Sequence, residues 1–67
     1  MNAKPRPKHL VTLAQWVILL CAGNDRYGLY RPTPKEMTPA RNLIAKGYGS
    51  WKGRQFLINR QGIQLVR

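Results

Sequence analysis

The sequence predicts one small α+β domain, and three observations lead to that class. The chain has 67 residues, which is enough for a single hydrophobic core. Two stretches, 12–23 and 38–47, begin with helix-start signals and end at a glycine. A third stretch, 48–58, changes to residues typical of strands around a glycine-containing turn. Hydrophobic residues make up 43% of the chain, which favours a folded domain over a disordered segment.

The charge of the chain is strongly unbalanced. Twelve lysines and arginines stand against two acids, Asp25 and Glu36, and the formal net charge is +10. A surface that served only solubility would mix the two signs. The excess therefore favours an anionic partner, with nucleic acid first.

The same composition excludes several kinds of site. The single cysteine, Cys21, leaves no internal disulfide and no zinc site built on cysteine pairs, and the single histidine, His9, leaves no multi-histidine metal site. The only serine is Ser50, and two carboxylates are too few for an acid–base pair together with a metal cage. We therefore expect neither an enzyme nor a cofactor.

The start of the chain is basic. Residues 1–9 are expected to form a flexible arm, because Pro5 and Pro7 prevent a helix and the charges keep the segment in water, and residues 10–67 are expected to form the domain. Two interpretations of the arm stay open: a solvated terminus, or a segment that lies along a phosphate backbone.

A signal peptide is an alternative interpretation of the same region. Basic residues precede the apolar run 17–22, but Thr12 and Gln15 interrupt the apolar stretch. The run is far shorter than the roughly 20 residues that a transmembrane helix needs. We therefore expect a cytoplasmic protein.

The first helix is predicted to begin after Thr12. Thr12 and Gln15 have the spacing of a capping box, and Gly23 is a natural end. The body from Leu13 to Ala22 is apolar almost all round, which indicates a central helix buried on more than one side. The residues expected in the core are Trp16, Val17, Leu20 and Cys21.

A short strand and a short helical turn are predicted next. The segment 27–31 contains two tyrosines and fits a strand that ends at Pro32. Thr33 and Glu36 then have capping-box spacing, with Pro34 at the first helical position. These signals predict a single helical turn over 34–37.

The second helix is predicted to begin at a second proline. Pro39 would clash inside a helix that began at Pro34, so the sequence favours a new helix at 39–46, ended by Gly47. At helical spacing, one side of it is apolar and should dock on the first helix. The apolar residues are Ala40, Leu43 and Ile44.

A β-hairpin and a last helical turn are predicted to complete the domain. Segments 48–51 and 54–58 flank the two-residue turn Lys52-Gly53. Phe56 and Ile58 should share one face of the second strand. Asn59 can cap the final turn, and Ile63, Leu65 and Val66 should close the core.

Two segments carry a resemblance to a known family. The run from Asn42 to Trp51 contains a leucine, a basic residue, a glycine and an apolar residue in the order found at the end of a recognition helix and the first strand of a wing. The run from Phe56 to Leu65 looks like a second wing strand with its closing motif, with Asn59 where threonine is usual. Over about residues 10–66 the chain thus resembles the winged helix-turn-helix family, including small winged-helix proteins of phages and proteobacteria. The helix before the recognition helix is shortened to 34–37.

The resemblance implies a DNA-binding protein, and the expected function is a small phage-type transcription regulator that binds double-stranded DNA. The helix at 39–46 would face the major groove, and the hairpin at 51–54 would touch the backbone or the minor groove. Arg41 and Asn42 suit base edges, since arginine pairs with guanine and asparagine with adenine. The residues that suit phosphates are Thr38, Lys46, Lys52 and Arg54.

Other interpretations stay open. A small phage-type interaction protein or inhibitor would bind a host protein through the same surface, with exposed aromatic residues as anchors. The candidate anchors are Tyr27, Tyr30, Tyr48 and Trp51, of which Tyr48 and Trp51 are expected rather to pack in the core. RNA binding lacks a motif. A homodimer through the apolar first helix is a further hypothesis.

Overall fold

Residues 5–67 form three α-helices and a three-stranded antiparallel sheet in this computed structural model, so the predicted α+β class is confirmed. The first four residues of the expected arm lie outside the described residues. The elements in chain order are α1 (Leu13–Asn24), β1 (Leu29–Tyr30), the 3₁₀ turn η1 (Pro34–Glu36), α2 (Met37–Ala45), β2 (Gly49–Lys52), β3 (Gln55–Ile58) and α3 (Arg60–Val66).

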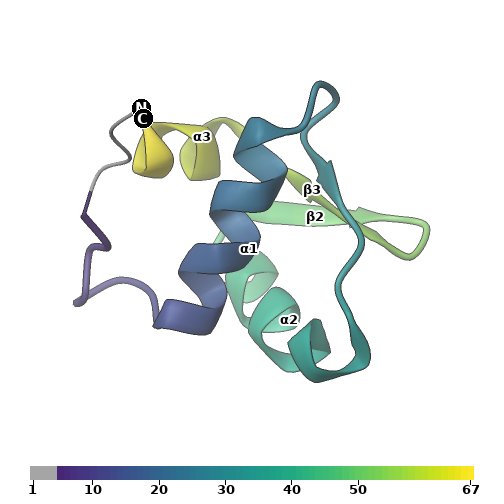
Figure 1. Cartoon of the computed structure of the whole chain (residues 1–67), viewed down its shortest axis with the longest axis horizontal. Helices are drawn as coiled ribbons and strands as arrows, with labels where there is room; N and C mark the ends of the chain where they lie inside the picture. Colours follow the sequence, from purple (N-terminus) through teal and green to yellow (C-terminus); the bar gives the residue numbers. More distant parts are fainter. Residues whose placement is uncertain (1–4) are drawn as a thin grey trace.

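The helix α1 is the central element, as predicted. It contacts α2, α3, β1 and β3, while the sheet has the order β1-β3-β2. Figure 1 shows α1 crossing the middle of the molecule, with the β2–β3 hairpin extending to one side and α2 beneath it. The buried hydrophobic residues come from all of these parts: Val11, Trp16, Ile18, Leu19, Ala22, Ala40, Leu43, Phe56 and Ile58.

The start of α1 is as predicted, but its buried face is not. Thr12 N–H donates to Gln15 Oε1 (3.0 Å), and Gln15 N–H donates to Thr12 Oγ1 (3.3 Å), so the capping box is present. Trp16 is buried, but Val17 is 41% exposed and Cys21 is also exposed, so their assignment to the core was wrong. When a helix is apolar on all sides, its sequence does not indicate which side faces the core.

Two further details of α1 correct or limit the sequence predictions. Leu20 is only half-buried against the core, and the helix continues through Gly23 to Asn24.

Within residues 5–67, no helix has the length and apolar character needed to cross a membrane.

The strand β1 is shorter than the predicted segment 27–31. Asp25 Oδ2 accepts hydrogen bonds from the backbone N–H groups of Tyr27 (2.9 Å) and Leu29 (3.0 Å), and Gly28 has a φ of +72°. This turn keeps residues 25–27 out of the sheet, while Gly28 O still accepts a hydrogen bond from Ile58 N–H (2.9 Å) on β3. Only two residue pairs then join β1 to β3.

The helix α2 begins at Met37, two residues before the predicted start. The turn η1 leads directly into it, and Pro39 occupies the first turn, where its missing N–H removes no helical hydrogen bond. The predicted end is confirmed: Gly47 has a φ of +89°. Its N–H donates to Ile44 O (3.0 Å), and Tyr48 N–H donates to Leu43 O (3.0 Å), which is a Schellman motif.

The predicted hairpin and final cap are present, with one shift. The two-residue turn is Gly53-Arg54 rather than Lys52-Gly53, because Lys52 pairs with Gln55. Gly53 has a φ of +61° and Arg54 a negative φ, as in a type II′ turn. Asn59 Oδ1 accepts from Gly62 N–H (3.0 Å) and caps α3, which is longer than the single turn expected.

The buried side of the last strand and helix is also as predicted. Phe56 and Ile58 are buried in the core, and three residues of α3 pack against it. These three are Ile63, Leu65 and Val66.

Candidate nucleic-acid interface

The outer side of α2 presents polar side chains. Arg41, Asn42 and Thr38 are all exposed, while Ala40 and Leu43 on the inner side are buried. The buried residues fix the rotation of α2 on α1, and they thereby direct the predicted base-contacting residues toward solvent. Because α2 begins at Met37, Thr38 lies in its first turn and not at its cap.

The β2–β3 hairpin places Trp51 and Lys52 on opposite faces of the sheet. Trp51 pairs with the buried Phe56 and so shares the face that covers the helices. Lys52 pairs with Gln55 and points to the other face. Arg54 stands in the turn itself, and it is exposed.

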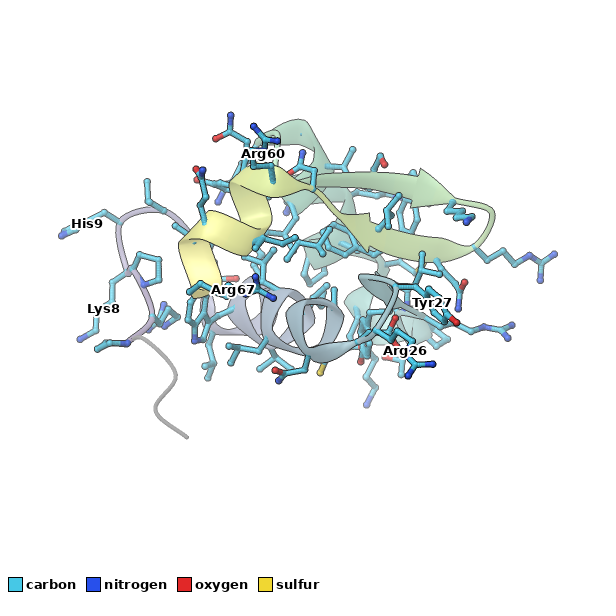
Figure 2. The ribbon with its side chains drawn as sticks, turned by 90° about the horizontal axis from the view of Figure 1, so that it is seen from above. Lys8, His9, Arg26, Tyr27, Arg60 and Arg67 are labelled. Atoms are coloured by element: carbon cyan, nitrogen blue, oxygen red, sulfur yellow. The ribbon has the colours of Figure 1, made fainter. Side chains whose placement is uncertain are left out.

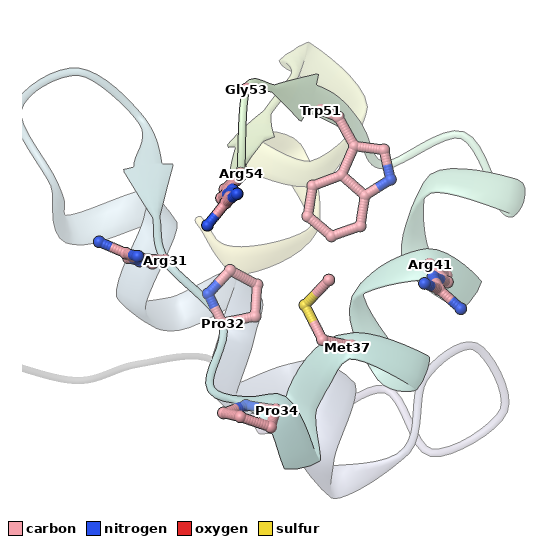
Figure 3. A pocket seen from close by; sticks show the side chains of 8 residues that line it. All are labelled: Arg31, Pro32, Pro34, Met37, Arg41, Trp51, Gly53 and Arg54. Carbon is pink, nitrogen blue, oxygen red and sulfur yellow. The ribbon is translucent and has the colours of Figure 1, made fainter.

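A cleft of about 570 Å³ opens between α2, the hairpin and the segment that joins β1 to η1. Its floor is apolar and is formed by Pro32, Pro34, Met37 and Trp51. Figure 3 shows Met37 pointing between the ring of Pro32 and the indole of Trp51. We call this hollow the Trp51 cleft.

Three arginines line the Trp51 cleft from three different parts of the chain. Arg31 follows β1, Arg41 projects from α2, and Arg54 comes from the hairpin turn (Figure 3). They bring three guanidinium groups around one apolar floor. Guanidinium groups are planar donors that match phosphate oxygens, and they are always charged near neutral pH.

A hydrogen-bond network holds the segment between β1 and η1. Glu36 Oε1 accepts from Thr33 N–H (2.9 Å) and from the Tyr30 hydroxyl (2.8 Å). The bond from the backbone of Thr33 lowers the pKa of Glu36, and the bond to Glu36 raises the pKa of Tyr30 to about 12. This network fixes the wall of the cleft that carries Arg31 and Pro32.

The two side-chain carboxylates do not neutralise the arginines of the cleft. The hydrogen bonds of Asp25 go to the backbone of the α1–β1 turn, and those of Glu36 go to Thr33 and Tyr30. Positive charge also lies elsewhere: Figure 2 shows Lys8 at one end of the molecule and Arg26 beside Tyr27, far from Lys8. The distinguishing feature of the cleft is therefore that three arginines line one apolar floor.

Lys46 lies away from the cleft, at the end of α2. Its Nζ donates to Leu10 O (2.7 Å) and to the side-chain Oε1 of the buried Gln15 (3.0 Å). Lys46 therefore fastens the end of α2 to the start of α1. Of the six predicted residues, the structure brings Arg41 and Arg54 together at the cleft and leaves Thr38 and Asn42 on the adjoining outer side of α2.

Part of this site has no signal in the sequence. Arg31, Pro32 and Met37 belong to no motif, and only the fold brings them to the hairpin. Trp51 was expected in the core, but it is 37% exposed and forms part of the cleft. Its position beside the hairpin turn was the one available signal, because strand ends are less covered than strand centres.

Comparisons of this chain with models of protein families, with curated proteins and with solved structures found no match. Among residues 5–67, no group of three or more His, Cys, Asp or Glu side chains is placed to hold a metal ion.

Proposed function

We propose that this protein binds double-stranded DNA through α2 and the hairpin turn, as a small winged helix-turn-helix transcription regulator. The order of elements supports this proposal: helix, strand, short turn, helix and hairpin follow one another, with the sheet order β1-β3-β2. In this arrangement α2 is the recognition helix and the β2–β3 hairpin is the wing. Double-stranded DNA admits a helix into its major groove.

The observation that carries the proposal is that Arg31, Arg41 and Arg54 all line the Trp51 cleft, next to the exposed Asn42. Arg41 and Asn42 are the groups that contact base edges, and Arg31 and Arg54 contact phosphates on either side of the groove. Lys52 stands beside the hairpin turn and adds a further phosphate contact. The net charge of +10 attracts the duplex from a distance.

The salt dependence of binding to a duplex of random sequence tests the proposal. With about six phosphates neutralised, the logarithm of the association constant should fall against the logarithm of the salt concentration with a slope near −5. Arg54→Ala and Lys52→Ala should each make the slope shallower by about 1 and weaken all sequences alike. Arg41→Ala should in addition reduce the preference for sequences selected from a random pool.

The matched control is Arg60→Ala, which removes the same charge from α3, outside the cleft. Its slope should change less than that of Arg54→Ala. Absence of duplex binding at low salt, or equal slopes for the two variants, would contradict DNA binding through this surface.

A second candidate function is protein binding, and the exposed side of α1 favours it. Leu13 is 63% exposed, Val17 is also exposed, and the helix has no charged residue along its length. Such a face suits a partner protein or a second copy of the chain. Light scattering at micromolar concentration separates these states: a monomer alone excludes the homodimer.

A further inference from the structure

The apolar floor of the Trp51 cleft is not explained by contacts with DNA phosphates. Pro32, Met37 and Trp51 carry no charge, and the indole N–H is the only strong polar group of their side chains. Phosphates need exposed cations rather than a hollow. A hollow of about 570 Å³ with apolar walls and a few polar groups is typical of a site that takes a small organic group.

Trp51 is presented to such a group. Its strand partner Phe56 is fully buried, whereas Trp51 keeps more than a third of its surface exposed. Figure 3 looks onto the broad face of its indole ring, with Met37 and Pro32 beside it. A flat aromatic group that entered the cleft would stack on this ring, and stacking on an aromatic side chain is a main source of affinity for unpaired bases.

The three arginines add the charge that a nucleotide needs on both sides of its base. They come from the segment after β1, from α2 and from the hairpin turn, so three separate parts of the chain bring positive charge to the floor. In a DNA strand, a phosphate precedes and follows each base. We propose that the Trp51 cleft receives one unpaired nucleobase of a DNA strand, which stacks on Trp51 while Arg31 and Arg54 hold the neighbouring phosphates. This inference rests on the proposed binding of DNA at the same surface.

The phosphates of a DNA strand fit the donors of the cleft better than an acidic peptide does. The polar side-chain groups of the cleft are guanidinium and indole N–H groups, which donate hydrogen bonds and accept none. The phosphates bring acceptor oxygens only, so they match these donors. A peptide backbone brings an N–H donor with nearly every carbonyl, and those donors would find no side-chain acceptor here.

Three duplexes of the same sequence test the inference with the full chain. The first is fully paired, the second has a single thymine bulge, and the third has the same bulge with an abasic residue in place of thymidine. Binding is measured by anisotropy of the labelled DNA and by tryptophan emission. Trp16 is buried in the core, so quenching of the emission reports on Trp51.

We expect the thymine bulge to bind about fivefold or more tightly than both other duplexes and to quench the emission. Trp51→Leu, which keeps an apolar floor, should reduce its affinity to that of the abasic bulge. The matched control Tyr27→Leu removes an exposed aromatic residue outside the cleft and should keep the preference. Should Trp51→Leu not fold, the comparison of the three duplexes with the wild type decides alone.

The other outcomes are distinct. Equal affinity for all three duplexes overturns the inference and leaves duplex binding intact. An abasic bulge that binds as tightly as the thymine bulge also overturns it, because the protein then recognises bending alone. If no duplex binds at low salt, the proposed function fails together with the inference. An acidic peptide with one aromatic residue that then binds the wild type but not Trp51→Leu assigns the cleft to a protein partner.

Discussion

Replacement of Lys46 by methionine separates a structural role from a DNA-binding role for this residue. The change keeps the aliphatic stem and removes the ammonium group, with its hydrogen bonds to Leu10 O (2.7 Å) and Gln15 Oε1 (3.0 Å). A hydrogen bond contributes a net stabilisation of about 0.5–1.5 kcal/mol. Because Lys46 is exposed and screened by solvent, we place both of its bonds in the lower part of that range. We expect the free energy of unfolding to fall by about 1–2 kcal/mol.

Thermal unfolding followed by circular dichroism measures this loss. For a domain of this size, each kcal/mol corresponds to about 4–8 °C in Tm, so Lys46→Met should melt roughly 5–15 °C lower than the wild type. Lys35→Met is the matched control, because Lys35 is an exposed lysine on the short turn η1. The control removes the same charge and should change Tm by a few degrees at most.

The DNA-binding measurement on the same two proteins completes the test. Below the melting temperature, Lys46→Met should keep the salt slope of the wild type, because its ammonium group is engaged with α1. A slope shallower by about 1, together with an unchanged Tm, would refute the structural role and return Lys46 to the phosphate contacts.

Three further changes test the framework of the site. Gly49→Ala would place a Cβ atom 2.5 Å from Phe56 Cζ, and such overpacking should lower the free energy of unfolding by about 1–3 kcal/mol or more. The loss is measured as a lower urea midpoint, and an unchanged midpoint would contradict the close approach of Phe56 to Gly49. Asn59→Ala removes the cap of α3 and the bond from Asn59 Nδ2 to Gly47 O (2.9 Å), so unfolding should become easier by about 1–2 kcal/mol, whereas full stability would show that the cap is dispensable. The pKa of Glu36 is lower in the folded protein than its ordinary value of 4.5, so the wild type should lose stability as the pH falls through and below that value. Glu36→Gln should flatten the dependence of Tm on pH between about pH 5 and pH 3. An unchanged dependence would exclude a stabilising role for the hydrogen bonds from Thr33 and Tyr30 to Glu36.

Features with a local physical cause were predictable from the sequence. The capping box at Thr12, the positive φ at Gly47 and the cap at Asn59 each depend on a few neighbouring residues, and all three are present. The hairpin was also predictable, but its turn was placed one residue early. Both positions put a glycine in a two-residue turn, and only the pairing of Lys52 with Gln55 distinguishes them.

Features that depend on packing between distant segments were not predictable. The rotation of α1 was wrong at Val17 and Cys21, because a helix that is apolar on all sides gives no preference for one face. The Trp51 cleft joins residues from 31–34, 37–41 and 51–54, which no sequence motif connects. Arg41 and Arg54 were predicted to act together through the family resemblance, whereas Arg31 was found only in the structure.

One cationic surface, centred on the Trp51 cleft, is proposed to contact the DNA. A titration of isotope-labelled protein with a short duplex, followed by amide and arginine side-chain NMR signals, tests it most directly. We expect the largest changes at Arg31, Arg41, Arg54 and the Trp51 indole N–H, with little change along the exposed side of α1. Changes concentrated at Leu13 and its neighbours on α1, with the four cleft signals unmoved at saturation, would contradict it.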